Sequence, residues 1–546
     1  MTGPGGDGSD ALADFVVAGA GHNSLITAAY LARAGYSSII VEARPIPGGG
    51  ASTEDWLVPG LGIDACSTGH TLIRLNPLIR DDELGLVARY GLAYVDPDPV
   101  AHVAFPDGEH LTMSLDAEKT IAEFGRFSSA DAAAYRRLLE EWADVAAVFG
   151  SDRFRPVGYG PSIDEMLEGH PRASTWRRRQ AMSAYDLIMA TFEDRHCQAF
   201  LLWMTFQTIV AIDRPGTGLL AYSLIAGRQR NSWSIPLGGS GTLIDALVGF
   251  LADHDVAIIC DKRVTNLVVE DGRCVGIETA DGSTYRGRRG VISTVHIKHL
   301  VDMAPAECWG EDFLYGVETY EVGLSGFTVY LVATQPPVFA TPQGGRTAVS
   351  AGIVDWPDRF LAMLRRLNDN LAFEPDLESG IEHGTGRVPF LLVATPTLVD
   401  TSRTVDGLHT VKLLSAVASD PGPGRTWTEH KATLADWYLG AVRRFCPDFT
   451  DEVIVANDVR SPEDLERYNP HMIRGAYHGG DRTPANSGVN RPVPGWAQHR
   501  MPIPGLYQTG GTTHPGGSIT GAPGRNAAHI ILEDLGHDPS RFVPLP

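Results

Sequence analysis

The chain has 546 residues, which is too long for one simple hydrophobic core, so we expect two or more domains. Hydrophobic residues make up 43% of it and charged residues 20%, as in an ordinary globular protein. A formal net charge of −21 at pH 7 argues against nucleic acid or an anionic membrane surface as a partner.

Cysteine usage and the first residues bear on the cellular location. The six cysteines are scattered and form no C-x-x-C pair: Cys66, Cys197, Cys260, Cys274, Cys308 and Cys446. This spacing predicts reduced thiols in a cytoplasmic protein, and neither a zinc site nor a redox disulfide. Residues 1–10 are glycine-rich and acidic and lack the basic and apolar regions of a signal peptide. No apolar run approaches the ~20 residues of a membrane-spanning helix, whereas a peripheral membrane contact stays open.

A strand, a glycine turn and a helix are predicted at the start of the chain. The continuous apolar run 15–18 is typical of a strand covered on both faces. Gly19 allows the turn, and Gly21 lets a diphosphate approach the backbone without meeting a Cβ atom. The predicted helix 23–34, which opens at Asn23, directs its N-terminal amides and its dipole at that diphosphate.

An acidic residue and a small serine complete this motif. The second predicted strand, 37–41, ends at Glu42, about twenty residues past the glycines, where a carboxylate accepts hydrogen bonds from ribose hydroxyls. Ser24 replaces the third glycine of the fingerprint, whose role is close helix–strand packing. A glycine-rich helix cap in an unrelated α/β domain is the alternative, but it does not explain Glu42. The pattern therefore predicts dinucleotide binding.

A second glycine-rich segment, 48–54, follows this acidic residue. Alone it is typical of a flexible surface loop, but directly after a dinucleotide unit we interpret it as a second wall of the same site. The residues expected at the cofactor here are Ala43, Arg44, Gly49, Gly50, Ala51 and Ser52. Residues 62–70 are small and polar and are compatible with a strand that ends, at His70, near the ring system of the cofactor.

The middle of the chain, 116–230, is predicted to be helical, with amphipathic segments at 131–149 and 162–167. The stretch 172–211 carries aromatic and methionine residues at helical spacing: Trp176, Met182, Tyr185, Phe192, Phe200, Trp203, Met204 and Phe206. This spacing favours a core role over a substrate-lining role. We interpret the run Arg177, Arg178 and Arg179 as a solvated helix face rather than an anion site.

A β-rich unit follows between residues 231 and 300. A glycine turn at 233–241 precedes a predicted helix at 243–253, and strands are predicted at 256–260, 264–270, 274–279, 283–286 and 291–294. Asp-Gly pairs at 271–272 and 281–282 predict hairpin turns. The unit belongs with the first strands, so the cofactor domain is discontinuous. Val264 and Thr294 are expected at the cofactor.

The last part of the chain predicts a mixed sheet and then a return to the cofactor. Strands are predicted at 325–333, 389–395 and 410–419, with helices at 358–368 and 428–445. A strand from Leu506, a glycine-dense loop and a helix to Leu535 close the chain. Close backbone approach to a flat ligand accounts for so many glycines in one loop. The residues expected at the ligand are Gly511, Gly517, Ser518, Thr520, Gly521 and Ala522.

These pieces, in this order, resemble the phytoene desaturase-like family of FAD-dependent oxidoreductases, which includes carotenoid desaturases, carotenoid isomerases and retinol saturases. The matching segments are 16–24, Glu42, 48–54, 236–239, 264–294, 512–517 and 521–528. The resemblance implies non-covalent FAD and an α/β fold with a discontinuous glutathione-reductase-like, Rossmann-type FAD domain. We expect that domain at 1–80, 231–300 and 490–546, and a mixed α+β substrate domain at 81–230 and 301–489. Residues 165–230 do not match the carotenoid binders, so a smaller organic substrate stays open.

The resemblance implies that hydride passes from a C–C, C–N or C–O bond of an apolar or small organic substrate to the flavin. Histidine can titrate near neutrality, and three histidines are candidates for an assisting base: His514, His70 and His478. The final electron acceptor stays open between oxygen and a quinone.

Two alternatives remain. The first is an amine-oxidase-type flavin oxidase, in which a lysine often lies near the flavin. The chain has Lys119, Lys262, Lys298, Lys412 and Lys431, none in a motif loop, which favours a dehydrogenase. The second is a non-catalytic binder on a similar fold, like the Rab escort and inhibitor proteins. Those proteins have lost the flavin contacts, whereas this chain keeps Glu42 and the C-terminal glycine loop.

Overall fold

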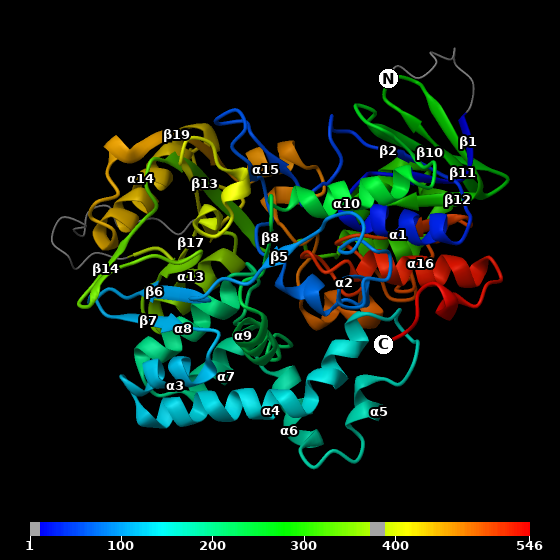
Figure 1. Cartoon of the computed structure of the whole chain (residues 1–546). Helices are drawn as coiled ribbons and strands as arrows, with labels where there is room; N and C mark the ends of the chain where they lie inside the picture. Colours follow the sequence, from blue (N-terminus) through cyan, green and yellow to red (C-terminus); the bar gives the residue numbers. More distant parts are fainter. Residues whose placement is uncertain (1–10, 372–387) are drawn as a thin grey trace.

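Two seven-stranded sheets form the two halves of the molecule, on the right and left of Figure 1. The computed structural model describes residues 11–371 and 388–546. The segment 1–10, on which the signal-peptide expectation rests, lies outside the described residues. No helix in the described ranges is long and apolar enough to cross a membrane.

The first sheet has a parallel centre and an antiparallel edge. Its strands are β1 (Ala11–Ala18), β2 (Ser38–Val41), β9 (Ala257–Ile259), β10 (Val264–Glu270), β11 (Arg273–Thr279), β12 (Thr284–Ser293) and β20 (Leu506–Gln508). Their order is β10-β11-β12-β1-β2-β9, with β20 also on β12. The pairs β1–β2, β1–β12, β2–β9 and β12–β20 are parallel, whereas β10–β11 and β11–β12 are antiparallel. The predicted Rossmann-type α/β sheet is confirmed.

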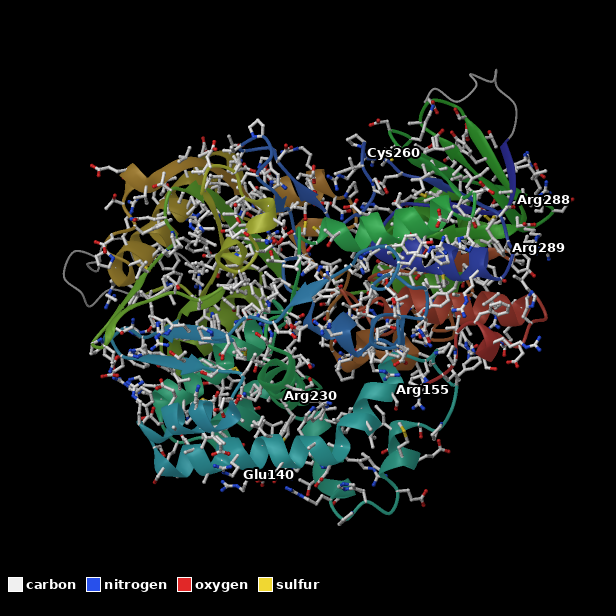
Figure 2. The ribbon with its side chains drawn as sticks, in the orientation of Figure 1. Glu140, Arg155, Arg230, Cys260, Arg288 and Arg289 are labelled. Atoms are coloured by element: carbon white, nitrogen blue, oxygen red, sulfur yellow. The ribbon has the colours of Figure 1, made fainter. Side chains whose placement is uncertain are left out.

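One strand prediction in this sheet is wrong. The separate strands expected at 283–286 and 291–294 form the single ten-residue strand β12. Its pairing with β1 shifts register where Gly287 and Gly290 face Ala13 and Phe15, so the segment between them is a β-bulge. Arg288 and Arg289 in this bulge are exposed (Figure 2), and the Arg289 guanidinium lies over the Tyr36 ring.

The helices α1 (His22–Arg33), α10 (Gly241–Ala252) and α16 (Ala522–Asp534) lie together beside this sheet (Figure 1). Helix α1 packs against both of the others. Its Thr27 hydroxyl donates to the carbonyl of Gly524 at 2.9 Å, which joins the first helix of the chain to the last. The predicted helices at 23–34 and 243–253 and the C-terminal helix are confirmed.

The second sheet is mixed, as predicted. Its strands are β6 (Ala101–Ala104), β7 (His110–Met113), β13 (Ser325–Ala333), β16 (Ser350–Ile353), β17 (Leu391–Ala394), β18 (His409–Val417) and β19 (Ile454–Arg460). Their order is β19-β13-β18-β17-β16-β6-β7, and β16–β6 is parallel while the other pairs are antiparallel. The helices α13 (Pro357–Asn368) and α14 (Trp427–Phe445) lie with this sheet, where the sequence predicts them.

A helical layer fills the lower part of Figure 1. It comprises α3 (Ala117–Gly125), α4 (Ser129–Arg153), α5 (Ile163–Leu167), α6 (Ala173–Ala181), α7 (Ala184–Thr191), α8 (Arg195–Phe206) and α9 (Leu220–Asn231). Six of the eight aromatic and methionine residues predicted as core are at most 4% exposed, namely Trp176, Phe192, Phe200, Trp203, Met204 and Phe206, whereas Met182 and Tyr185 are only partly buried. Glu140 stands on the outer face of the amphipathic α4 (Figure 2), and Arg177 and Arg178 are exposed as predicted. The prediction of a solvated face is wrong for Arg179, which pairs with Glu141 at 2.7 Å and lies over the Trp176 ring.

Several short elements lie outside the two large sheets and the helical layer. They are β3 (Thr53–Glu54), β4 (Ile63–Asp64), β5 (Tyr94–Val95), β8 (Ile235–Pro236), β14 (Phe339–Thr341), β15 (Gly344–Arg346), α2 (Pro77–Arg80), α11 (Ile297–Leu300), α12 (Glu311–Glu318) and α15 (Pro462–Tyr468). The strand considered for 62–70 exists only as the two residues of β4. All strands of the first sheet fall within the ranges expected for the FAD domain, and those of the second within the substrate ranges. The exact boundaries stay a prediction.

Candidate active site

Two adjoining cavities of about 210 Å³ each lie at the carboxyl ends of the parallel strands. Gly19, Glu42 and Thr294, which follow β1, β2 and β12, line the first, here called the strand-end cavity. The second, here called the inter-sheet cavity, lies between the C-terminal glycine loop and strands β17 and β18 of the other sheet. Both cavities are lined by His22, Asn23, Gly50, Asn469, His471 and Gly511. In open α/β sheets this edge is where ligands bind.

The glycine turn has one crowded and one open position. A Cβ atom on Gly19 would lie 2.4 Å from the Thr294 hydroxyl oxygen, and Gly19 has a φ of +96°, so only glycine fits. A Cβ on Gly21 would meet no atom of the described chain within 4 Å, because Gly21 faces the strand-end cavity. Gly21 is also the N-cap of α1 and provides no side-chain cap, so the first amides of α1 are free for an anion.

Glu42 lies at the edge of the same cavity and is held by backbone amides. It is 8% exposed, and its two carboxylate oxygens accept hydrogen bonds from Ala20 N at 2.7 Å and from Arg44 N at 2.9 Å. A carboxylate has further lone pairs, so Glu42 can still accept from the hydroxyls of a ribose. This is the position that the sequence motif predicts.

Ser24 explains how the motif does without its third glycine. The side chain is fully buried, and its hydroxyl lies 2.6 Å from the carbonyl oxygen of Gly19 and 2.9 Å from that of Gly21. The serine therefore closes the turn from inside and leaves the cavity side of the turn unobstructed.

The predicted cofactor residues divide into two sets. Lining one or both cavities are Gly19, Gly21, Asn23, Glu42, Ala43, Arg44, Gly49, Gly50, Val264, Thr294, Gly511, Gly517 and Ser518. Buried behind that lining are Ser24, Ala51, Ser52, Thr520, Gly521 and Ala522. In this second set, the Ser52 hydroxyl lies 2.6 Å from the Tyr468 hydroxyl, and the Thr520 carbonyl accepts from Asn76 at 2.8 Å.

These residues fit FAD. The open space at Gly21 and the free amides of α1 suit a diphosphate, and Glu42 suits a ribose. The glycine loop after β20 is packed too tightly for side chains, since a Cβ on Gly517 would lie 2.3 Å from the carbonyl oxygen of His478. Gly517 lines the inter-sheet cavity, where the flavin ring and a substrate would meet.

Of the three candidate histidines, the structure brings one to a cavity. His478 lines the inter-sheet cavity, and its Nε2 donates to the carbonyl of Thr208. His70 is fully buried outside the lining, with Nε2 2.9 Å from the Ser240 hydroxyl oxygen. His514 is also outside both linings, with Nε2 3.0 Å from the carbonyl oxygen of Asp152. Desolvation lowers the pKa of His478 and of His70 to about 3, and it also lowers the pKa of His514.

Sequence reasoning missed two histidines that line both cavities. His22 is the first residue of α1, inside the glycine motif, and its position there was a signal that could have been used. His471 lies outside every motif, and its Nδ1 is 3.0 Å from the carbonyl oxygen of Thr294. Desolvation lowers the pKa of each to about 4, so both imidazoles are neutral at pH 7.

Sequence reasoning also set Lys412 aside because it lies in no motif loop. Lys412 stands on β18, is 7% exposed and lines the inter-sheet cavity. Its ammonium group donates to the carbonyl of Cys66, and burial lowers its pKa to about 8. Lys412 reaches the cavity because it stands on the second sheet. No local sequence pattern reveals that this sheet borders the site.

Residues 17–80 match the family described as NAD(P)-binding Rossmann-like domain. A pyridine nucleotide-disulfide oxidoreductase domain-containing protein 2 of Mus musculus is 26% identical, over 96% of this chain and 94% of its own. A limonene dehydrogenase component from Castellaniella defragrans is 26% identical, over 96% of this chain and 95% of its own. A lycopene-forming phytoene desaturase of Pseudescherichia vulneris is 25% identical, over 95% of this chain and 99% of its own.

Solved structures share the fold at low sequence identity. A variant of putrescine oxidase covers 96% of this chain and 100% of its own with a TM-score of 0.61 at 15% identity. Cyclohexylamine oxidase from Brevibacterium oxydans covers 96% of this chain and 100% of its own with a TM-score of 0.56 at 16% identity. The motifs, the site and the relatives together confirm the predicted resemblance to phytoene desaturase-like enzymes and indicate an FAD-dependent oxidoreductase.

Proposed function

We propose that the protein dehydrogenates a small organic molecule held in the inter-sheet cavity, with FAD extending from the strand-end cavity into it. The observation that carries this proposal is the sharing of His22, Asn23 and Gly511 by the two cavities. A ligand in one cavity and a ligand in the other can therefore both contact these three residues. Bound FAD supplies the acceptor for a hydride from the substrate.

The residues of the chain bind, orient and exclude water. In this proposal Gly19, Gly21 and Glu42 hold the nucleotide half of FAD, and the loop around Gly517 forms a wall for the ring. Apolar side chains, among them Leu224 of α9 and Leu414 of β18, line the inter-sheet cavity and keep water from the reacting bond. The relatives named for limonene and phytoene are consistent with a substrate that is mostly apolar.

His478 is the candidate that we carry into the mechanism. Its Nε2 must hold the proton, because it donates to the Thr208 carbonyl, so its Nδ1 presents a lone pair without a partner in the described chain. With a pKa of about 3 the ring does not retain a second proton at pH 7. We therefore assign Nδ1 the role of accepting a hydrogen bond from the substrate, which orients the bond to be oxidised. His514 and His70 stay predictions without an assigned step.

Anaerobic mixing of the FAD-loaded protein with substrate classes tests the proposal. Alcohols, amines and saturated hydrocarbons with apolar bodies are added in turn, and bleaching of the flavin absorbance is followed. We expect one class to bleach the flavin, with the loss of two hydrogens confirmed in the product by mass spectrometry. If dithionite reduces the bound flavin but no class of substrate does, the proposed dehydrogenation is wrong.

A flavin oxidase of the amine-oxidase type remains the second candidate, and the position of Lys412 favours it. The absence of lysine from the motif loops argued against this function, yet Lys412 lines the inter-sheet cavity. Reoxidation of the reduced protein separates the two candidates. Rapid reoxidation by oxygen with release of hydrogen peroxide, slowed in Lys412→Met, supports an oxidase. Slow reaction with oxygen and rapid reaction with a quinone support a dehydrogenase.

The cellular setting remains a proposal as well. All six cysteines are free thiols in the structure, and we infer a cytoplasmic location from their scattered spacing. Peripheral contact with a membrane stays open. Fractionation of cells that express the full chain, with and without a high-salt wash, tests both statements.

A further inference from the structure

Two cations line the inter-sheet cavity, and neither has a carboxylate partner among the described residues. Arg228, on α9, is 8% exposed, and Lys412, on β18, is 7% exposed. The Nη2 group of Arg228 donates to Gln207 at 2.8 Å, while its buried Nη1 group has no hydrogen-bond partner in the described chain. Lys412 donates to the carbonyl of Cys66. Burying a charge costs free energy unless the charge is paired, so we expect an anion from outside the chain to pair with these two cations.

The rest of the lining supplies no counter-charge from the part of the chain that the structure describes. No Asp or Glu within those residues lines this cavity. The histidines His22, His471 and His478 are neutral at pH 7, because desolvation lowers their pKa values to about 4, 4 and 3. Arg228 and Lys412 therefore give the cavity a positive charge in a protein whose net charge is −21.

The FAD diphosphate does not account for these cations. Its place in the proposed function is at Gly19 and Gly21 in the strand-end cavity, and neither Arg228 nor Lys412 lines that cavity. The cations therefore line the cavity that holds the substrate in the proposed function.

The surroundings of Arg228 orient it for a planar anion. Gln207 fixes one Nη group, and the guanidinium carbon lies 5.5 Å from the centroid of the Trp233 ring. The free Nη1 group remains as a donor, and a guanidinium matches a carboxylate better than it matches a neutral group. Apolar residues such as Ile209, Leu224 and Leu392 complete the lining around it.

We propose that the substrate is a carboxylate on an apolar body, with Arg228 as the anion-binding residue and Lys412 as a second cation. This inference rests on the proposed function, because it names the class of molecule that the inter-sheet cavity oxidises. It separates this chain from enzymes whose substrates are uncharged hydrocarbons.

Paired probes that differ only in charge test the inference. Benzoate and benzamide, and octanoate and octanamide, are titrated calorimetrically into the FAD-loaded full-length protein at pH 7. We expect each acid to bind about 10- to 100-fold more tightly than its amide, the range for a hydrogen bond to a charged group. Arg228→Met should reduce this preference to about threefold or less, and Arg228→Lys should restore part of it.

Arg230→Met is the matched control. Arg230 lies two residues further along α9 and is exposed (Figure 2), so its removal should leave the preference for acids unchanged. If Arg228→Met does not fold, Lys412→Met provides the second variant and should weaken binding of the acids but not of the amides. Flavin absorbance of each sample is recorded before titration. A protein that holds no FAD contradicts the proposed function, whereas an FAD-loaded protein without a preference for acids contradicts this inference alone.

A role of the two cations at the flavin, rather than at the substrate, gives a different experimental result. If they stabilise negative charge on the reduced flavin, Arg228→Met shifts the flavin reduction potential and leaves the ratio of acid to amide affinity unchanged. That result would overturn the proposed substrate class.

Discussion

Gly524 and Asn23 lie 501 residues apart in the sequence and are in direct contact where α16 meets α1. The Gly524 amide donates to the Asn23 side-chain oxygen at 3.2 Å, and a Cβ on Gly524 would lie 2.3 Å from the Asn23 carbonyl oxygen. Asn23 lines both cavities, so this contact joins the last helix of the chain directly to the wall of the site.

Gly524→Ala should therefore weaken both the fold and the cofactor site. The added methyl group must push α16 away from α1, and overpacking of this kind costs about 1–3 kcal/mol. Thermal unfolding of the FAD-loaded protein measures the effect. Gly440→Ala is the control, because Gly440 lies within α14 and a Cβ there would meet no atom of the described chain within 4 Å. That control should be neutral or slightly stabilising.

Glu42→Ala should loosen FAD by about 1.5–3 kcal/mol, or roughly 10- to 150-fold in Kd. The substitution removes the carboxylate proposed for the ribose and leaves the amides of Ala20 and Arg44 without their acceptor. Reconstitution of the apoprotein with FAD, followed by flavin fluorescence, gives Kd. An unchanged Kd in Glu42→Ala would show that the ribose lies elsewhere.

Gly21→Ala and Gly19→Ala should have separable effects. At Gly21 the methyl group points into open space, so the apoprotein should keep its unfolding temperature while the FAD Kd rises about tenfold or more. At Gly19 the methyl group meets Thr294 at 2.4 Å in a left-handed backbone, so the apoprotein itself should be destabilised. Equal FAD affinity in Gly21→Ala and the parent would argue against a diphosphate at this turn.

The histidine variants should differ in the rate of flavin reduction. His478→Ala removes a residue that lines the inter-sheet cavity, together with its Nδ1, which has no hydrogen-bond partner in the described chain, and should slow reduction about 10-fold or more. His514→Ala changes a residue outside both linings and should leave that rate within about threefold of the parent. Stopped-flow reduction under anaerobic conditions compares the two. If His514→Ala slows flavin reduction more than His478→Ala does, the catalytic role belongs to His514.

Binding of acids should weaken as the pH rises through about 8. Burial lowers the pKa of Lys412 to about 8, so its ammonium is charged below that pH and becomes neutral above it. Loss of this charge should reduce the affinity for benzoate severalfold between pH 7 and pH 9 and leave benzamide unaffected. The step should be absent in Lys412→Met. If the affinity for benzoate still falls between pH 7 and pH 9 in that variant, another group is responsible for the titration.

Much of the fold could be predicted from local chemistry. The glycine turn at Gly19, the acid at Glu42 and most strands of the first sheet follow from conformational limits and apolar periodicity, which neighbouring residues determine. In the second sheet only β13, β17 and β18 were predicted, and β6, β7, β16 and β19 were missed. The gap expected between strands 283–286 and 291–294 is a β-bulge instead, and glycine is common in turns and bulges alike.

The site was less accessible to sequence reasoning. Arg228 and Lys412 come from a helix and a strand in different parts of the chain, and only tertiary packing decides that both line one cavity. His514 drew attention because it lies in a glycine-dense loop, yet its side chain points to the carbonyl of Asp152. Motifs thus locate the backbone that holds the cofactor, whereas the side chains around a substrate depend on how the two halves pack.

The return of the chain to its first sheet has a consequence for biosynthesis. Strand β20 extends the first sheet along β12, and α16 packs against α1, yet both are translated after every other strand of this sheet. A nascent chain that still lacks residues 506–546 carries the glycine turn and Glu42 but neither the glycine loop nor the final helix. We therefore expect FAD to be captured only after residues 506–546 have been translated, as a late step of folding, and nascent chains to depend on chaperones until then.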